Sequence, residues 1–234
     1  MLTSFIVPAH NEEALLAATL ASIHTAARAA RLDYEIIVVD DASTDRTAEI
    51  ARAHDAQVCI VALRQISAVR NAGARAARGE WLIFVDADTV VTPQVVSAAC
   101  AAMNSGVVGG GANVEWEGHL PMWARMLATS TLLTMRVATL AAGCFVFCTR
   151  PAFLATGGFD ETVFATEELW FSRALKQQGR FVILREAVIT SSRKLRTYTG
   201  LEVVTMTLPL FYRGLAVFRD RRYLALWYGE RRRD

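Results

Sequence analysis

The chain has 234 residues, of which 53% are hydrophobic and 21% charged. This length and composition suit one sizeable α/β domain and exclude a disordered chain. With 25 basic and 23 acidic residues, the formal net charge is only +2, so the chain lacks the positive excess of a dedicated nucleic-acid-binding protein. Its four cysteines form no CxxC pair, which excludes a zinc finger and a disulfide framework and favours a reducing compartment.

Two apolar stretches, 121–148 and 201–218, deserve comparison with membrane spans. Arg125 and Arg136 interrupt the first, and Glu202 and Arg213 interrupt the second, so neither is expected to cross a bilayer. The N-terminus also lacks the basic and apolar regions of a signal peptide. The sequence therefore predicts a cytoplasmic protein without transmembrane helices.

The first half of the chain alternates between the hydrophobic periods of strands and helices. This alternation predicts βαβ units and a mainly parallel central sheet flanked by helices. Strands are expected at 4–8, 34–39, 58–61 and 81–85, and helices at 11–31, after Ser43 or Thr44 as cap, at 68–78 and at 93–103. Glu12 and Glu13 suit the first turn of the first helix because they complement its dipole. Later segments predict a helix at 168–178, a strand at 181–189 and a helix at 201–218 kinked at Pro209.

Polar residues follow three of the predicted strands. They occur at 8–12, at Asp40 and Asp41, and at Asp86 and Asp88, and the carboxyl ends of parallel strands are where ligands bind in an open sheet. Asp40 and Asp41 also fit an ordinary solvated turn. Asp86 and Asp88 repel each other unless a cation joins them, and oxygen ligands of this kind predict Mg²⁺ or Mn²⁺.

Six motifs then occur in one order along residues 3–180. They are VPAHNEE at 7–13, VVDDASTDRT at 38–47, RNAG at 70–73 followed by Gly79-Glu80, DAD at 86–88, GGFDE at 157–161, and Glu167-Glu168 followed by Arg173. This ordered set resembles the family 2 glycosyltransferases with the GT-A fold. The resemblance implies a single GT-A domain over 1–234, with a nucleotide-sugar-binding half at 1–104, an acceptor and catalytic half at 105–190 and a basic, aromatic helical extension at 191–234.

The resemblance implies an inverting, metal-assisted transferase with a nucleotide-sugar donor of the UDP type. The expected donor-site residues are Pro8, His10, Glu12, Asp40, Asp41, Arg70 and Asp86. Asp41, and less directly Asp40, would accept the N3–H of a uracil-type base. Asp88, with Asp86 beside it, would hold the metal that stabilises the leaving nucleoside diphosphate. For Arg70, an exposed position on a helix surface is the alternative.

The same resemblance implies an acceptor side in the second half of the chain. Gly158 belongs to a turn whose backbone must approach something closely, and Asp160 would contact acceptor hydroxyls, although it also suits an ordinary turn. Glu168 stands where the family carries its general base, usually an aspartate, and Glu167 stays open as the base because the pair here is Glu-Glu. An acidic first turn of the helix at 168–178 is the alternative explanation for both glutamates.

From Arg185 to Asp234 the sequence turns basic, with ten arginines and one lysine against five acidic residues. Residues 191–196 predict either a loop that closes over the donor diphosphate or a solvated basic loop. Aromatic residues and arginines alternate through 201–228. That mixture fits peripheral contact with the inner face of a membrane, a helix covering the core, or a dimer interface.

The absence of one sequence motif narrows the expected activity. No QxxRW motif follows residue 173, which separates the chain from processive polysaccharide synthases and predicts one transfer per encounter to a sugar, lipid-linked or small-molecule acceptor. Two other classes remain open. Asp86 and Asp88 also resemble the first motif of haloacid-dehalogenase phosphatases, and a non-catalytic nucleotide-sugar-binding module remains if Glu167 and Glu168 do no chemistry.

Overall fold

The structure is a computed structural model that describes residues 1–118, 120–193, 202, 214–220 and 224. Most of the helix expected at 201–218 and most of the extension expected at 191–234 lie outside the described residues. Within that region a 3-10 helix, η1, runs from Gly214 to Arg219. Among the described residues, no helix is both long and apolar enough to cross a membrane.

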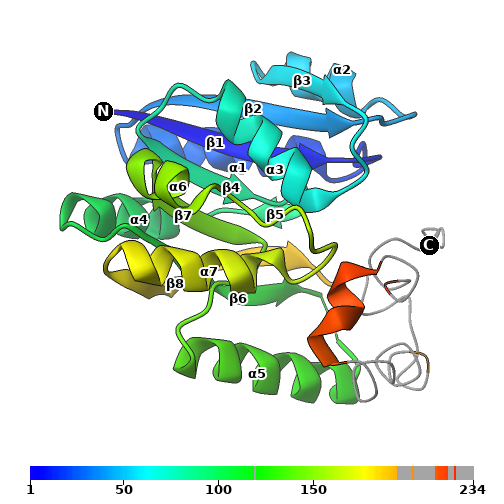
Figure 1. The fold of residues 1–234 in the computed structure, drawn as a ribbon. Coiled ribbons are helices and arrows are strands. Elements are labelled where there is room, and N and C mark those ends of the chain that lie inside the picture. The colour runs from blue at the N-terminus through cyan, green and yellow to red at the C-terminus, as the bar shows by residue number, and fades with distance from the viewer. Residues whose placement is uncertain (119, 194–201, 203–213, 221–223, 225–234) are drawn as a thin grey trace.

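One eight-stranded sheet runs through the molecule in the order β3-β2-β1-β4-β7-β6-β8-β5 (Figure 1). Its strands are β1 (Leu2–Ala9), β2 (Asp33–Asp41), β3 (Gln57–Val61), β4 (Trp81–Val85), β5 (Thr89–Val90), β6 (Gly109–Glu117), β7 (Phe145–Thr149) and β8 (Phe181–Ser191). The strands from β3 to β4 are parallel to one another, as is β6 to β8. Only β7 and β5 run against their neighbours. The sheet is therefore mainly parallel, as predicted.

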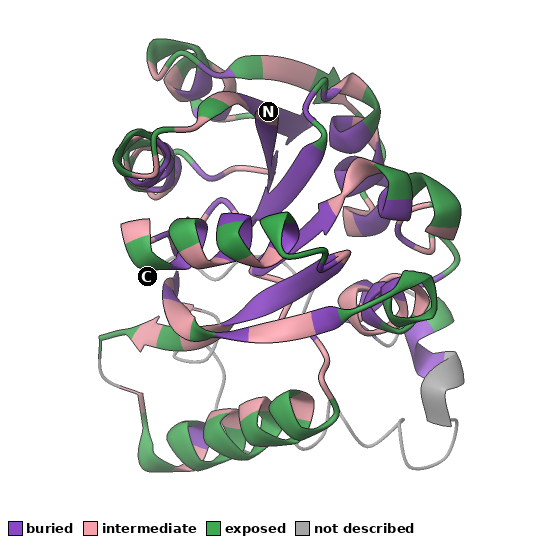
Figure 2. Cartoon of the chain, turned by 90° about the vertical axis from the view of Figure 1, so that its left-hand side faces the viewer, coloured by how far each residue is buried: buried purple, intermediate pink, exposed green. Residues whose placement is uncertain are grey.

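Helices cover both faces of this sheet. They are α1 (Leu16–Ala29), α2 (Thr47–Ala53), α3 (Ile66–Ala76), α4 (Pro93–Asn104), α5 (Met122–Val137), α6 (Arg150–Thr156) and α7 (Glu167–Gln178). In Figure 1, α1 and α4 lie behind the sheet, and α3, α6 and α7 lie in front of it. In Figure 2, α5 stands apart from this layered body, with green, exposed residues along most of its length.

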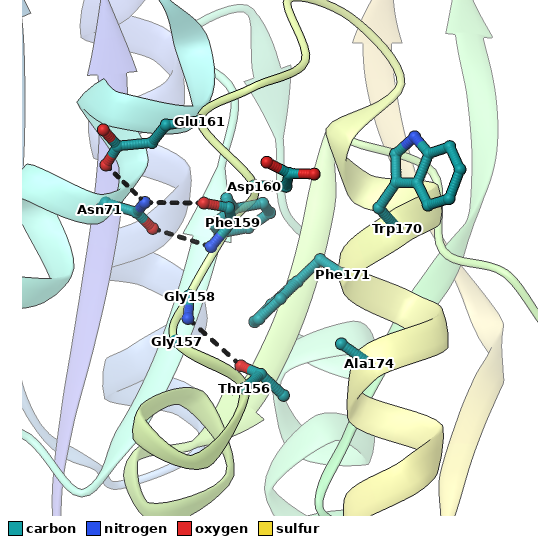
Figure 3. A pocket seen from close by; sticks show the side chains of 10 residues that line it. All are labelled: Asn71, Thr156, Gly157, Gly158, Phe159, Asp160, Glu161, Trp170, Phe171 and Ala174. Atoms are coloured by element: carbon teal, nitrogen blue, oxygen red, sulfur yellow. Dashed lines mark hydrogen bonds between the residues drawn. The ribbon is translucent and has the colours of Figure 1, made fainter. Parts of the chain in front are cut away.

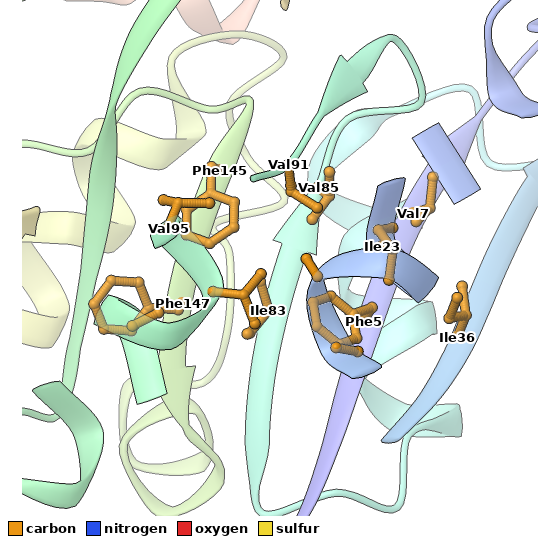
Figure 4. Close-up of a cluster of buried hydrophobic side chains, with 14 of the residues drawn as sticks. Phe5, Val7, Ile23, Ile36, Ile83, Val85, Val91, Val95, Phe145 and Phe147 are labelled. Carbon is orange, nitrogen blue, oxygen red and sulfur yellow. The ribbon is translucent and has the colours of Figure 1, made fainter. Parts of the chain in front are cut away.

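Alternation along the strands builds one hydrophobic core on each face. Phe5 and Val7 of β1 pack toward α1 and α4, and the labelled side chains of Figure 4 belong to this cluster. Ile6, between them, packs toward α3 with Phe84 of β4. Because successive side chains of a strand point to opposite faces, a strand buried on both sides reads as a continuous apolar run. This is why the sequence WLIFV at 81–85 predicted β4 to the residue.

Two expectations about the first helices were wrong. The first helix begins at Leu16 rather than at residue 11 and has no acidic residue in its first turn, because Asn11 adopts a left-handed backbone with φ of 52°. Neither Ser43 nor Thr44 caps α2, whose N-cap is Arg46 without a side-chain bond. Both residues bind Asn11 instead, Ser43 through its hydroxyl and Thr44 through its backbone N–H, which donates to the Asn11 side-chain oxygen.

Candidate active site

The carboxyl ends of β1, β2 and β4 meet at one edge of the sheet. Ala9 at the end of β1 is opposite Asp40 of β2, and Ile6 is opposite Phe84 of β4. Asp86 follows β4 directly, so the register brings it level with the end of β1. The structure thus brings the three polar segments predicted from the sequence to a common edge, at the right of Figure 1.

Asp41 and His10 lie at the carboxyl ends of β2 and β1 and are held by a shared set of hydrogen bonds. Oδ1 of Asp41 accepts the backbone N–H groups of Leu63 (2.7 Å) and Arg64 (3.0 Å) from the loop after β3. Nδ1 of His10 donates to the Asp41 carbonyl at 2.8 Å, and a guanidinium nitrogen of Arg64 donates to His10 Nε2 at 2.8 Å. In the described part of the chain, both hydrogen bonds to the Asp41 carboxylate use Oδ1 rather than Oδ2. Pro8 lies within β1, one residue before this edge.

Asp40 and Glu12 have partners that the sequence did not reveal. Oδ1 of Asp40 accepts the backbone N–H of Ser43 at 3.0 Å, so this carboxylate stabilises the turn after β2. Glu12 forms an ion pair with Arg193 at 3.0 Å, across 181 positions of sequence. Arg193 belongs to the basic segment expected to approach the donor. Of that segment, residues 194–196 lie outside the described residues.

Asp86 and Asp88 lie in the turn between β4 and β5. Oδ1 of Asp86 accepts a bond from a terminal guanidinium nitrogen of Arg70 at 2.7 Å, and 34% of the Asp86 side chain is exposed. The Asp88 carbonyl accepts the backbone N–H of Ser191 at 3.1 Å, which fixes the turn against the end of β8. Both aspartates are half-buried, so a ligand at the sheet edge can reach them.

Arg70 of α3 is the buried hub of the site. Its side chain is 2% exposed and donates to Glu167, to Asp86 and to the Gly143 carbonyl (2.8 Å). Its guanidinium also lies 5.3 Å from the centroid of the Phe159 ring. The alternative of an exposed helix arginine is therefore wrong. Burial opposes the charge, but the surrounding carboxylates raise the pKa of Arg70 above its ordinary value, so it remains a cation at any working pH.

Glu167 and Glu168 begin helix α7 in contrasting environments. Glu167 is buried and bound to Arg70, whereas Glu168 is half-buried. Burial raises the pKa of Glu167 although Arg70 opposes the shift. Burial, followed by the charge of Glu167, raises the pKa of Glu168 to about 8, and Arg70 again opposes the shift. A carboxyl with such a pKa is suited to exchange a proton near neutral pH.

Left-handed backbone conformations concentrate in the loops of this edge. Asn11, Ala42, Arg64 and Thr166 all have φ between 52° and 60°, and none is glycine. Such conformations cost about 1–3 kcal/mol each and persist where the surrounding structure enforces them. Thr166 directly precedes Glu167, so its conformation sets the direction in which the two glutamates leave the loop.

The loop at 157–161 joins α6 to the segment before α7. Gly158 has a φ of +84°, and a Cβ there would lie 2.6 Å from the Asn71 side-chain oxygen. The close approach predicted for this turn is therefore made to Asn71, which also bonds both backbone groups of Phe159 (2.9 Å each). Asp160 points toward Trp170 in Figure 3 and caps the Thr162 N–H at 2.8 Å.

A pocket of about 550 Å³ lies beside this loop. Phe159 and Phe171 form its floor, and Asp160 and Trp170 stand at its rim (Figure 3). The Phe159 ring separates it from Arg70, whose guanidinium is 5.3 Å from the ring centroid. The residues that line this pocket include Asp160 but not Asp86, Asp88, Glu167 or Glu168.

The carboxylates of this edge fit a divalent cation held together with a substrate. Among the residues that the structure describes, no group of three or more His, Cys, Asp and Glu side chains is arranged to hold a metal ion. Asp86 and Asp88 alone supply carboxylate oxygens to the turn between β4 and β5. Mg²⁺ is commonly bound by one or two carboxylates together with substrate phosphates and water, and this donor set matches that mode.

Several functional contacts were missed from the sequence. Arg64 and Gly143 carried no expected role, although they bind His10 and Arg70 respectively. Arg193 was expected within a loop that closes over the donor diphosphate or a solvated basic loop, and its contact with Glu12 was not predicted. Asn71 lay inside the quoted RNAG motif, which was the available signal, but its role in holding the 157–161 loop was not predicted. These contacts join segments 50 or more residues apart, so local spacing gave no indication of them.

The family model described as glycosyl transferase family 2 matches residues 4–153. The chain belongs to this family. Validoxylamine A glucosyltransferase of Streptomyces hygroscopicus subsp. limoneus is 34% identical over 107 residues, which cover 43% of this chain and 23% of that protein. Dolichol-phosphate mannosyltransferase of Pyrococcus furiosus is 28% identical over 151 residues, covering 59% and 41%. Each alignment thus spans less than half of the relative's own length.

Solved structures support the same fold for this family member. A mannosyltransferase from Pyrobaculum calidifontis, in complex with GDP-Man and Mn²⁺, has a TM-score of 0.65 at 19% identity and covers 97% of this chain and 71% of its own. Glucosyl-3-phosphoglycerate synthase from Mycobacterium tuberculosis, in complex with Mn²⁺, UDP and phosphoglyceric acid, has a TM-score of 0.63 at 17% identity and covers 93% and 78%. The chain has the GT-A glycosyltransferase fold, and the haloacid-dehalogenase alternative is set aside.

Proposed function

We propose that this chain transfers a sugar from a nucleotide-diphosphate donor of the UDP type to an acceptor hydroxyl, with inversion at the anomeric carbon. The observation that carries the proposal is that Arg70 binds both Glu167, at the start of α7, and Asp86, at the sheet edge. This places the Glu167–Glu168 pair beside the edge that bears Asp41, Asp86 and Asp88, and burial raises the pKa of Glu168. Solved relatives of the fold bind UDP or UDP-GlcNAc. We assign one transfer per encounter, on the cytoplasmic side.

On the donor side, each residue has a separate task. Asp41 Oδ2 accepts the N3–H of the base, while His10 and Pro8 line the base pocket and the Glu12–Arg193 pair closes it near the ribose. Asp88, with Asp86, would hold Mg²⁺ or Mn²⁺, which supplies positive charge against the leaving diphosphate. Arg70 contributes indirectly, since it fixes Asp86 from beneath at 2.7 Å.

On the acceptor side, Glu168 accepts the proton of the attacking hydroxyl. The hydroxyl oxygen forms a bond to the anomeric carbon, the bond between that carbon and the phosphate oxygen breaks, and the nucleoside diphosphate leaves with the electron pair. Attack opposite the leaving group inverts the configuration. Asp160 orients other acceptor hydroxyls. The acceptor is a sugar, a lipid-linked saccharide or a small molecule. Of the segment 201–228 the structure describes 202, 214–220 and 224, and Val217, Phe218 and Leu224 pack with Ala165.

A matched pair of variants tests the assignment of the base. Glu168→Gln keeps size and hydrogen bonding but cannot take a proton, so turnover should fall about 10²-fold or more while donor affinity stays within a few-fold. Glu167→Gln should lower turnover less, because Glu167 is engaged by Arg70. Turnover and UDP affinity are measured separately with a panel of UDP-sugars, Mn²⁺ and simple glycoside acceptors. If Glu167→Gln abolishes turnover while Glu168→Gln lowers it only slightly, Glu167 is the base instead. If both variants keep their turnover, neither glutamate is the base.

A further inference from the structure

Helix α5 carries an apolar stripe that the rest of the described chain leaves uncovered. Met122, Met126, Leu133 and Val137 are 61–79% exposed, and their spacing of four, seven and four residues places them along one helix face. Leu127, also exposed, flanks this stripe. Only Ala124 of the sixteen residues is buried. A contiguous apolar surface of this kind marks an interaction site.

The charges and length of α5 define what can cover the stripe. The helix carries Arg125 and Arg136 and no acidic residue, and their spacing of eleven residues, three helical turns, places both along the same side of the stripe. Sixteen residues make a helix about 24 Å long, shorter than the roughly 30 Å apolar core of a bilayer. A short amphipathic helix with basic flanks suits the plane of an anionic membrane surface.

The hydroxyl groups of Ser130 and Thr134 have hydrogen-bond partners within the helix, so they could enter an apolar environment without losing a partner. The hydroxyl of Ser130 donates to the Leu127 carbonyl at 2.9 Å, and that of Thr134 donates to the Ser130 carbonyl at 2.8 Å. These polar groups are therefore satisfied within the helix. Arg136 donates to the Asn113 side-chain oxygen at 2.6 Å, which anchors α5 to β6. Arg125 and Arg136 are both exposed.

We propose that α5 docks this chain on an anionic lipid bilayer. Met122, Met126, Leu133 and Val137 enter the boundary between headgroups and acyl chains, and Arg125 contacts lipid phosphates. A second copy of the chain is a poorer occupant, because α5 offers no carboxylate to pair with the arginines of its counterpart. Since β6 is parallel to β8 and runs in the direction of β4, α5 begins at the sheet edge that carries Asp86 and Asp88. Docking would thus bring that edge to the membrane surface.

Vesicle flotation of the full chain tests this docking directly, without reference to sugar transfer. Vesicles of phosphatidylcholine alone are compared with vesicles that also contain phosphatidylglycerol. The variant with Met126→Glu and Leu133→Glu should bind the anionic vesicles at least tenfold more weakly. Leu154→Glu is the matched control, because Leu154 is a 67% exposed leucine on α6, and it should bind as the wild type does. Arg125→Gln should reduce binding about fivefold, and only to the anionic vesicles.

Thermal unfolding of each variant confirms that the fold is retained, and Met126→Ser with Leu133→Ser replaces the glutamate variant if it does not fold. Equal binding by wild type and the doubly substituted chain would overturn the proposal, since another surface would then carry the contact. Absence of wild-type binding to either vesicle would overturn it as well. So would a dimer in vesicle-free solution that the double substitution splits, because α5 would then be an interface between two copies.

Discussion

Asp41 and Glu167 are both carboxylates with less than a tenth of their surface exposed, yet they are held by different partners. Asp41 accepts two backbone N–H groups through one oxygen, whereas Glu167 is bound to the buried guanidinium of Arg70. Backbone amides fix a carboxylate in place without adding charge. Arg70 instead adds a positive charge, which interacts electrostatically with Glu167 and also with Asp86 and Glu168.

Under the proposed function, this difference would separate recognition of the nucleotide base from proton transfer. The backbone-held side presents a carboxylate fixed by main-chain N–H groups. The arginine-held side gathers three carboxylates around one cation. Burial, followed by the charge of Glu167, raises the pKa of Glu168 to about 8, although Arg70 opposes the shift. Pairs of carboxylates in environments of opposite effect are a common way to obtain an acid or base near neutral pH.

Removing the cation should cause the largest effect. Arg70→Met leaves Glu167 buried without its partner, and breaking a buried ion pair costs about 3–5 kcal/mol. The free energy of unfolding, measured by urea denaturation, should fall by that amount near pH 7. Arg75→Met is the control, because Arg75 is on the same helix with 65% of its side chain exposed, and it should change stability by no more than about 0.5 kcal/mol. Equal losses in both variants would contradict the hub role of Arg70.

Removing a proposed metal ligand should separate metal binding from base recognition. Asp88→Ala should reduce the affinity for UDP in the presence of Mn²⁺ at least about tenfold, because a carboxylate on a hard cation is lost, while affinity without Mn²⁺ stays unchanged. Titration calorimetry measures both. Asp33→Ala, at an exposed aspartate at the start of β2, serves as control. A variant that retains its Mn²⁺-dependent gain would remove Asp88 from the metal site.

The pH dependence of transfer should identify Glu168 as the titrating group. Below its pKa of about 8 Glu168 holds a proton and cannot act as a base, so kcat/KM should rise about tenfold per pH unit and level off above pH 8. In Glu168→Gln this rising limb should disappear. The same shift destabilises the fold as pH rises, since a pKa raised on folding favours the folded state only while the group is protonated. The variant should therefore gain thermal stability relative to wild type above about pH 8 and not at about pH 4. A flat wild-type rate profile would exclude this assignment.

Substituting the backbone-held carboxylate should have the smallest effect. Asp41→Asn keeps an oxygen for the N–H groups of Leu63 and Arg64 but turns the second oxygen into a donor, which opposes the N3–H of uracil. UDP affinity should fall about tenfold, with affinity for CDP, whose N3 is an acceptor, unchanged or increased. Calorimetry with both nucleotides measures this change of preference. An equal loss for both would mean that Asp41 supports the loop without reading the base.

Prediction from the sequence succeeded where one short segment holds both a secondary-structure element and the polar residues that follow it. The strand at 81–85 and the DAD motif after it belong together because a buried apolar run ends where polar residues begin. The start of α1 was placed too early, because Glu12 and Glu13 looked like first-turn residues. Their backbone N–H groups instead donate to Thr47 and Asp45, contacts across more than 30 residues that periodicity does not report.

The sequence by itself determined the mainly parallel sheet, the order of the motifs and the residue types of the site, because strand and helix periods and strand-end carboxylates are local properties. Only the tertiary structure decided that Arg70 is buried among Glu167, Asp86 and Gly143, that Glu167 and Glu168 differ in burial, and that the face of α5 is uncovered. Burial and charge coupling depend on which distant segments pack together. The Glu-Glu pair fits an acidic helix turn in the sequence, whereas the tertiary structure buries Glu167 against Arg70 and raises the pKa of Glu168 through burial and the neighbouring charge of Glu167.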